Sequence, residues 1–336
     1  MVAPMAVMAD ATVYGKVRVA TQYHDRDGQE WWDDDDQVVE RVSNDTWGME
    51  DQISRLGIKG SEDLGNGLKA IYQMEFGVNV GDGFGKDSFW SQRNSYVGLA
   101  GGWGTFLMGR HDTPYKISSG KLDFFVDTAA DYDNGCDVST TCDFNPNGAG
   151  QLFNSLRVDG AMAYISPSFA GFTFAGALVQ TDTDGGYDAA DDFVSAYSLA
   201  AMFHNGPWFA SLAYENLDAE SLNGRLLDED DDSKWRVGLG ILGWAGFSAS
   251  FIYEDRQNVT FRDGDDRTSW QLQAAYDFGN NRVKAMYGDR DDDSFADADY
   301  DTWAIGFQHN LSKRTDVQVL YKALDGDDNV LDDNVF

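Results

Sequence analysis

Residues 54–76 read SRLGIKGSEDLGNGLKAIYQMEF, and the second half of this stretch alternates between apolar and polar side chains. From residue 68 onward, one parity carries only apolar side chains, namely Leu68, Ala70, Tyr72, Met74 and Phe76. The other parity carries Lys69, Gln73 and Glu75, with Ile71 as its apolar exception. Successive side chains of a strand point to opposite faces, so a period of two indicates a strand with one apolar and one polar face.

The same alternation recurs along the rest of the chain. It is clear in 233–242, 247–256, 267–278 and 299–309, where aromatic and aliphatic side chains share one parity and polar or small side chains share the other. No segment shows a competing helical period. The 36 glycines, 21 phenylalanines and 15 tyrosines, with only five prolines, suit many strands joined by turns. The sequence therefore predicts an all-β protein.

The chain of 336 residues is strongly acidic, with 57 acidic and 25 basic residues and a formal net charge of −32. Only nine of the acids are glutamate, and aspartate is a poor former of helices and strands, so most of this charge belongs in loops. The lack of a basic stripe argues against nucleic-acid binding. No apolar run reaches the roughly 18 residues of a membrane helix, but the strands of a membrane barrel need only alternation over about ten residues.

The first residues and the two cysteines point to an exported protein. Residues 1–9 are apolar, and Val7 and Ala9 stand where a signal peptidase reads the chain, so we expect this segment to be the remnant of a signal peptide. The alternative is a short apolar N-terminus of a cytosolic protein. Cys136 and Cys142 lie close together in a loop-like segment, where export permits one disulfide. Without neighbouring histidine pairs they make a poor zinc site, and we expect no metal and no cofactor.

The connections between the expected strands are of two kinds that take turns along the chain. One kind is short, as in GGW at 101–103 and GNN at 279–281. The other is long and rich in aspartate, as in DRDGQEWWDDDD from residue 25 and DRDDDSFADAD from residue 289. A soluble sandwich has no reason to sort its loops in this way, whereas an outer-membrane barrel has short periplasmic turns and long external loops. The apolar face of each strand then looks outward at lipid, and the polar face lines water.

Counting with this rule gives fifteen strands and a stub at 334–336. An open sheet would leave an unpaired edge in lipid, so we expect a sixteen-stranded antiparallel transmembrane β-barrel whose last strand is truncated here. Residues 10–336 then form a single barrel domain. The expected strands are 12–24, 45–60, 67–80, 89–100, 104–111, 156–166, 172–181, 192–204, 208–218, 233–242, 247–256, 267–278, 282–289, 299–309 and 316–324.

The chain resembles a known family in the stretch at 54–76 and in three further motifs. These are YGKV at 14–17, RNSYVGLAGGWGTFLMGRHDTPYK at 93–116 and LRVDGAMAYISPSFAGFTFAGAL at 156–178. Together they resemble the Gram-negative general porins, in the branch typical of β- and γ-proteobacteria. The resemblance implies a homotrimeric outer-membrane channel, in contact with outer-membrane lipid and lipopolysaccharide, whose third external loop folds into the lumen. Such a channel passes small hydrophilic solutes and ions by passive diffusion.

The longest connection of the chain matches that third loop. It covers 112–155, and long loops without regular structure are usually functional. Its stretch GKLDFF at 120–125 resembles the constriction segment of the family. The resemblance therefore makes Asp123 the favoured acidic residue of the constriction and Asp127 the next.

The family places a ladder of arginines on the barrel wall opposite these acids. By motif, Arg55, Arg93 and Arg157 are the matching positions. Parity independently places Arg55 and Arg157 on the polar face, whereas Arg93 shares parity with apolar side chains of its strand and needs a bulge to face water. The other basic residues that parity places on this part of the lumen wall are Lys16, Arg18 and Lys59.

Two other classes of protein remain open. An outer-membrane β-barrel enzyme would need a positioned serine and histidine, for which the sequence offers no convincing pair. A secreted, calcium-stabilised β-rich binding protein would use the aspartate-rich loops. The GLGILG stretch at 238–243 fits a dinucleotide-binding pattern, but it lies in an alternating strand with no helix after it. Ion selectivity also stays open, because acidic loops favour cations and a basic wall favours anions.

Overall fold

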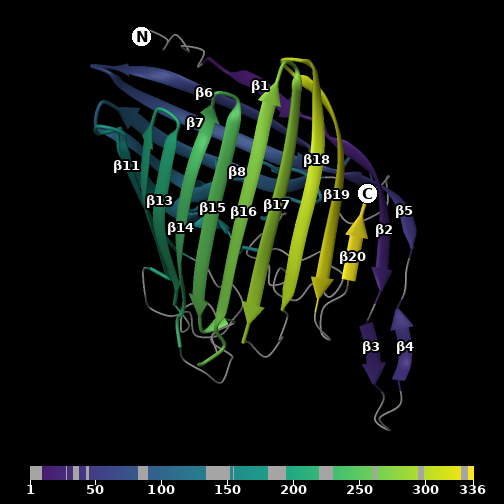
Figure 1. The fold of residues 1–336 in the computed structure, drawn as a ribbon. Helices are drawn as coiled ribbons and strands as arrows, with labels where there is room; N and C mark the ends of the chain where they lie inside the picture. The colour runs from purple at the N-terminus through teal and green to yellow at the C-terminus, as the bar shows by residue number, and fades with distance from the viewer. Residues whose placement is uncertain are drawn as a thin grey trace.

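The computed structural model describes residues 10–27, 29–32, 38–42, 45–81, 90–133, 152–153, 155–180, 194–218, 230–259, 263–293, 299–326 and 332–336. Most of these residues belong to one antiparallel sheet of eighteen strands, and a separate two-stranded ribbon extends from it (Figure 1). The all-β prediction is therefore confirmed. Among the described residues, no helix is both long enough and apolar enough to cross a membrane.

The strands follow one another around the sheet in chain order, and the ribbon interrupts this order after β2. Before the long loop come β1 (Thr12–Lys16), β2 (Val19–Asp27), the ribbon strands β3 (Gln29–Trp32) and β4 (Val38–Val42), then β5 (Thr46–Asp51), β6 (Arg55–Gly65), β7 (Leu68–Val78), β8 (Trp90–Gly101) and β9 (Gly104–Asp112). After it come β10 (Arg157–Ile165), β11 (Phe172–Val179), β12 (Ala196–Asn205), β13 (Trp208–Leu217), β14 (Asp232–Trp244), β15 (Phe247–Gln257), β16 (Arg267–Phe278), β17 (Asn281–Asp292), β18 (Tyr300–Ser312), β19 (Thr315–Gly326) and β20 (Asp332–Val335).

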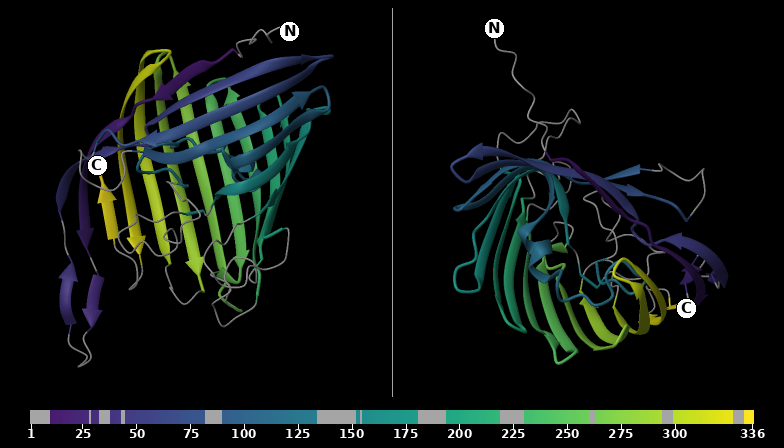
Figure 2. Two further views of the ribbon diagram at one scale, coloured as in Figure 1. Left: turned by 180° about the vertical axis from the view of Figure 1, so that it is seen from behind. Right: turned by 90° about the horizontal axis from the view of Figure 1, so that it is seen from above.

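The last strand brings the sheet back to its beginning. β20 pairs with β19 on one side and with β2 on the other, so the strands curve round into a ring (Figure 2). Since β1 and β2 together form one expected strand, and β5 and β6 another, the eighteen strands occupy sixteen positions. The four-residue β20 fills the sixteenth position, where the sequence predicts a stub. Among the described residues, β1 pairs only with β6, and the first half of β19 pairs only with β18.

Two of the expected strands are interrupted side by side. One break, at 17–18, separates β1 from β2, and the other, at 52–54, separates β5 from β6. The Ser54 hydroxyl accepts a hydrogen bond from the Arg18 N–H at 3.0 Å and donates one to the Arg18 carbonyl at 3.1 Å. The Gln52 N–H donates to the same carbonyl at 2.9 Å. These bonds replace the missing sheet bonds, which is required where no water can do so.

The short turns lie together at one end of the ring (Figure 1). The first of them, Asn66–Gly67, joins β6 to β7 with φ angles of 52° and 78°. Two consecutive positive φ angles form the tight hairpin turn that matches the twist of the flanking strands, and Asn-Gly adopts it at the lowest cost. The strand ends that the long connections join, such as those of β11 and β12 and of β17 and β18, lie at the other end, which agrees with the predicted sorting of the loops.

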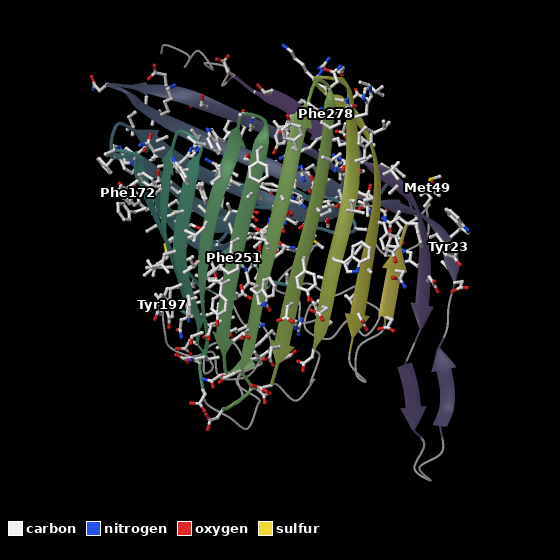
Figure 3. The ribbon with its side chains drawn as sticks, viewed as in Figure 1. Tyr23, Met49, Phe172, Tyr197, Phe251 and Phe278 are labelled. Carbon is white, nitrogen blue, oxygen red and sulfur yellow. The ribbon has the colours of Figure 1, made fainter. Side chains whose placement is uncertain are left out.

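The two faces of the strands differ as the alternation predicts. Along β16, Ser269, Gln271 and Gln273 are buried inside the ring, whereas Leu272 points outward and is 53% exposed. Exposed apolar side chains cover the outer surface from one end of the sheet to the other, among them Met49, Phe172, Tyr197 and Phe278 (Figure 3). An apolar outer surface around a polar interior is the arrangement of a barrel in lipid.

An arginine on the outer face tests this orientation. Ile305 lies in the middle of β18 and is 57% exposed, so Ile305→Arg places a charge in hydrocarbon and should cost about 2–4 kcal/mol of folding free energy in a bilayer. Gln308→Arg on the inner face of the same strand is the matched control and should cost less than about 1 kcal/mol. Urea unfolding in lipid vesicles measures both. Equal costs would contradict the assignment of the two faces.

Candidate pore constriction

The chain between β9 and β10 turns into the ring (Figure 2). It begins with the short helix α1 (Pro114–Ser119), which the sequence analysis did not predict. The Thr113 hydroxyl caps this helix by accepting from the Lys116 N–H at 3.3 Å. Proline suits the first helical turn because its missing N–H has no partner to lose there. The Thr-Pro pair was therefore a usable signal for a helix start inside the loop.

Arg236 of β14 holds both ends of this loop against the wall. Its guanidinium has no exposed surface, and it donates to the Ser119 hydroxyl at 2.8 Å and to the Ser155 hydroxyl at 2.9 Å. The same group forms an ion pair with Glu254 of β15 at 2.5 Å. Glu254 also accepts a hydrogen bond from the Tyr115 hydroxyl at 2.8 Å. A buried charge is tolerated only when it is paired and hydrogen-bonded, and here the loop supplies part of that pairing.

Small residues on the inner wall make room for the apolar side chains of the loop. A Cβ at Gly238 or at Gly240 would lie 2.5 or 2.6 Å from a methyl group of Leu122, so only glycine leaves the space that this leucine fills. Gly288 of β17 leaves similar space for Leu152. The two glycines on β14 belong to the GLGILG stretch at 238–243. Packing of the loop therefore accounts for two glycines of the apparent nucleotide-binding pattern.

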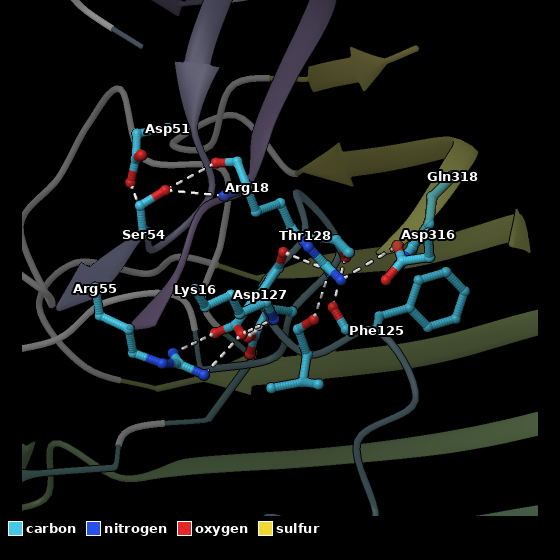
Figure 4. Close-up of polar contacts among 12 residues, drawn as sticks. Lys16, Arg18, Asp51, Ser54, Arg55, Phe125, Asp127, Thr128, Asp316 and Gln318 are labelled. Atoms are coloured by element: carbon cyan, nitrogen blue, oxygen red, sulfur yellow. Dashed lines mark hydrogen bonds and ion pairs between the residues drawn. The ribbon is translucent and has the colours of Figure 1, made fainter. Parts of the chain in front are cut away.

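Asp127 at the tip of the loop meets basic side chains of the wall (Figure 4). Its carboxylate contacts the Lys16 ammonium of β1 at 2.5 Å and the Arg55 guanidinium of β6 at 3.2 Å. Arg18 donates to the Asp127 carbonyl at 3.1 Å and lies 3.5 Å from the Asp316 carboxylate of β19. Burial raises the pKa of Asp127, but the hydrogen bonds and charges of Lys16 and Arg55 outweigh it and hold this pKa below its usual range.

Asp123 lies apart from the basic wall residues that the resemblance would place opposite it. Its side chain is turned between the loop and β16, where Oδ1 accepts from the Phe125 N–H at 2.7 Å and from the Gln273 amide at 3.4 Å. The residue is 8% exposed. Neither hydrogen-bond partner is a wall cation, so the described acid that forms ion pairs with the basic residues Lys16 and Arg55 is Asp127 and not Asp123. The GKLDFF stretch indicates that an acid is present but not the direction in which it points.

Arg93 points into the ring because β8 carries a bulge. The register between β7 and β8 shifts by one residue between the pair at Met74 and the pair at Phe76, which leaves an extra residue on β8. The bulge reverses the parity of the strand, so the Arg93 Nε donates to the Glu75 carboxylate at 2.7 Å. This is the irregularity that the sequence analysis identified as necessary for Arg93 to face water.

Lys59 and Arg157 also lie on the inner side of the wall. The Lys59 ammonium is 5.0 Å from the centre of the Tyr14 ring, a cation–π distance. Arg157 is 7% exposed and pairs with the Asp112 carboxylate at 2.9 Å. Arg110, which the sequence motifs do not single out, is equally buried and pairs with Asp159 at 2.9 Å.

Some of the predicted features lie outside the described residues. These are the disulfide between Cys136 and Cys142 and the signal remnant at 1–9, which stay predictions. Within the part of the chain that the structure describes, no three histidine, cysteine, aspartate or glutamate side chains are grouped to hold a metal ion.

A family model described as Gram-negative porin matches residues 1–329. The chain belongs to the Gram-negative porin family. This porin is a water-filled channel in the outer membrane of a Gram-negative bacterium, through which small hydrophilic solutes and ions diffuse passively. Porins are channels and not enzymes.

Individual relatives agree with the family. This porin is 28% identical over 325 residues to the major outer membrane protein P.IB of Neisseria meningitidis serogroup B, across 94% of this chain and 88% of that protein. The anion-selective porin from Comamonas acidovorans shares its fold with a TM-score of 0.70 and 21% identity, across 97% of both chains. The trimer form of in-vitro folded OmpT of Vibrio cholerae gives a TM-score of 0.58 at 14% identity, across 95% of this chain and 97% of the other.

A larger side chain at Gly238 tests whether the loop depends on the packing of Leu122 against the wall. Gly238→Val should push Leu122 away from the wall, at a cost of about 1–3 kcal/mol for overpacking, and move the loop further into the lumen. Single-channel conductance in a planar bilayer should therefore fall. Gly102→Val is the matched control, because nothing lies within 4 Å of a Cβ at that turn. Unchanged conductance in Gly238→Val would show that the position of the loop does not depend on this contact of Leu122.

Proposed function

We propose that the constriction of this porin lies where Asp127 meets Lys16 and Arg55, and that the charges around this point decide which solutes pass. The support is the exposure of the three side chains. Only 7% of the Asp127 side chain is exposed, whereas 32% of the Lys16 side chain and 25% of the Arg55 side chain are exposed. A passing solute therefore meets basic groups, with the carboxylate behind them.

Arg93 and Arg157 extend this basic surface along the wall. Arg93 keeps 18% of its side chain exposed beside Glu75, and Arg157 keeps 8% beside Asp112. Arg93 is thus the more accessible of the two. In this proposal Asp123 does not face solutes, and its role is to support the tip of the loop.

The charges around the constriction favour anions. Six described basic residues surround it against four described acidic ones, which leaves two positive charges in excess. They are Lys16, Arg18, Arg55, Lys59, Arg93 and Lys284 against Glu75, Asp127, Asp131 and Asp316. Charge of one sign on a narrow wall of low dielectric attracts the opposite ion. Salt screens the field of exposed carboxylates at the channel mouth beyond about 8 Å at physiological ionic strength, so the charges at the constriction dominate the ion selectivity. The anion-selective porin with the same fold supports this choice.

We also propose that the channel is a homotrimer embedded in outer-membrane lipid and lipopolysaccharide, without enzymatic activity or cofactor. The apolar outer surface supports contact with lipid and with further copies of the chain. The trimer form among the proteins of the same fold supports the number of copies. A barrel enzyme or a secreted calcium-stabilised protein has no comparable support.

Removing the charge of Asp127 tests the constriction. Asp127→Asn leaves the positive charges of Lys16 and Arg55 without their carboxylate, and one unit charge at contact distance is worth about 1 kcal/mol in water. The permeability ratio of chloride to potassium should therefore rise about 2–5-fold. Reversal potentials under a KCl gradient give this ratio. Asp325→Asn, which removes a carboxylate on the outer face, is the control and should leave the ratio unchanged. Equal effects would place the constriction elsewhere.

Acid should imitate this substitution. The pKa of Asp127 is lowered in the folded loop, so its ion pairs are present above the usual pKa of aspartate and are lost as pH falls through the lowered value. The chloride preference of the unmodified channel should rise below about pH 4, and Asp127→Asn should lack this step. An identical acid step in Asp127→Asn would assign the titration to another group.

The trimer has its own test. Insertion of the purified protein into a planar bilayer should raise the conductance in groups of three equal levels, and chemical cross-linking in detergent should stop at three copies. Single levels with no cross-linked species would show a monomer, and the proposed constriction would still stand.

A further inference from the structure

Asp123 and Asp131 form a buried pair of acids inside the loop. Each residue is 8% exposed. Asp131 accepts a hydrogen bond at both oxygens, from the Asp127 N–H at 2.6 Å and from the Asp133 N–H at 2.8 Å. Oδ2 of Asp123 is buried without a donor, and the carboxyl group that interacts with Asp123 is that of Asp131. Two carboxylates in this arrangement would present only acceptors to each other.

A single proton on one of the two carboxyl groups supplies the missing hydrogen-bond donor. If Asp123 is protonated at Oδ2, it becomes a donor to Asp131, while its Oδ1 keeps the bond from the Phe125 N–H at 2.7 Å. Asp131 stays ionised, because two backbone N–H groups favour the charged form. Two like charges buried side by side cannot both ionise without a large cost. Every polar atom of the pair then has a partner.

We infer that Asp123 and Asp131 share one proton and act together as positioning residues that aim the Asp127 carboxylate at Lys16 and Arg55. This inference rests on the proposed constriction and deepens it. Asp131 holds the backbone N–H of Asp127 directly. Asp127 has a φ of 55°, a backbone conformation that needs external support in a residue other than glycine. The shared proton keeps the two ends of the tip, at 123 and 131, together.

Neighbouring contacts fix the base of the tip but do not replace the pair. The Gln273 amide oxygen accepts from the Phe124 N–H at 2.8 Å, and the Lys284 ammonium donates to the Phe124 carbonyl at 2.8 Å. Phe125 has no exposed surface, and its ring lies 4.5 Å from the Lys284 ammonium. These contacts hold 124–125 on the wall, whereas Asp127 projects beyond them.

Other titratable groups face the pair and have to be separated from it. Lys284 of β17 faces it from the wall, and Tyr132 and Asp133 face it from the loop itself. Asp133 pairs with Lys116 at 2.7 Å. Burial raises the pKa of Asp133 to about 6, with Lys116 opposing the rise. Asp133→Asn therefore identifies any step that this residue causes.

The direction of the pH dependence follows from the shared proton. Burial, followed by the charge of Asp131, raises the pKa of Asp123 well above its usual range, and burial raises the pKa of Asp131. The ordered tip thus binds the proton more tightly than a released tip does. The stability of the ordered tip is therefore fully present at low pH and is lost as pH rises through the raised pKa of Asp123. The released tip withdraws the Asp127 carboxylate from the wall, so chloride preference should rise.

Two asparagine substitutions separate this inference from a structural role. In Asp123→Asn the amide donates to Asp131 permanently and its oxygen still accepts from Phe125, so the tip stays ordered at every pH. In Asp131→Asn the new amide N–H groups face the backbone N–H of Asp127 or Asp133, so the tip is disturbed at every pH. The heat-dependent gel shift establishes that each variant is folded.

Reversal potentials under a KCl gradient, from about pH 5 to about pH 9, read out all variants. The unmodified channel should gain chloride preference as pH rises, and Asp123→Asn should keep the low-pH value throughout. Asp131→Asn should show most of the shift of Asp127→Asn even at low pH, and adding it to Asp127→Asn should change nothing further. An alkaline step that persists in Asp123→Asn overturns the shared proton. If Asp127→Asn itself leaves selectivity unchanged, the proposed constriction fails instead.

Discussion

Lipid offers no hydrogen-bond partner to the backbone, and the whole ring depends on this constraint. Most strands satisfy it by pairing with their neighbours in chain order, and β20 joins the end of β19 to β2, whereas β1 and the first half of β19 are paired on one side only among the described residues. Where the first strand breaks at Arg18, the Ser54 hydroxyl and the Gln52 N–H supply the bonds that a regular ladder would have supplied. A four-residue strand and one serine hydroxyl therefore matter more here than they would in a water-exposed sheet.

The interior of the ring sets a different constraint, because the apolar side chains of the loop have to pack against the polar faces of the strands. The loop brings its own apolar side chains, and glycines on the wall take them up, as Gly238 and Gly240 do for Leu122. Arg236 then connects both ends of the loop to the wall through buried hydrogen bonds. The core of this porin thus lies between a loop and a wall, and the inner wall needs both small residues and charges.

The alternation of side chains and the lengths of the connections predict most of the fold, because the direction of a side chain in a regular strand depends only on its parity. Features that break parity could not be predicted in this way. The bulge at Arg93 depends on its register with β7, and the interruption between β1 and β2 depends on bonds from Ser54. The direction of Asp123 follows from Phe125 and Gln273, which lie two and 150 residues away from it. Such contacts are formed by the folded chain and leave no periodic signal.

One residue type behaves in three ways in this chain, according to what surrounds it. Asp263 and Asp266, in the connection between β15 and β16, are exposed, and water stabilises their charge. Asp127 is buried against two cations, which lower its pKa below the usual range after burial has raised it. Asp123 and Asp131 are buried without an ion pair to any described cation, and burial raises the pKa of both. A net charge of −32 consequently says little about the constriction, where the described residues leave basic charge in excess. Selectivity in such a channel depends on the charges that line its narrow part, where they are partly exposed and little screened by salt. The total composition of the chain does not report where those charges lie.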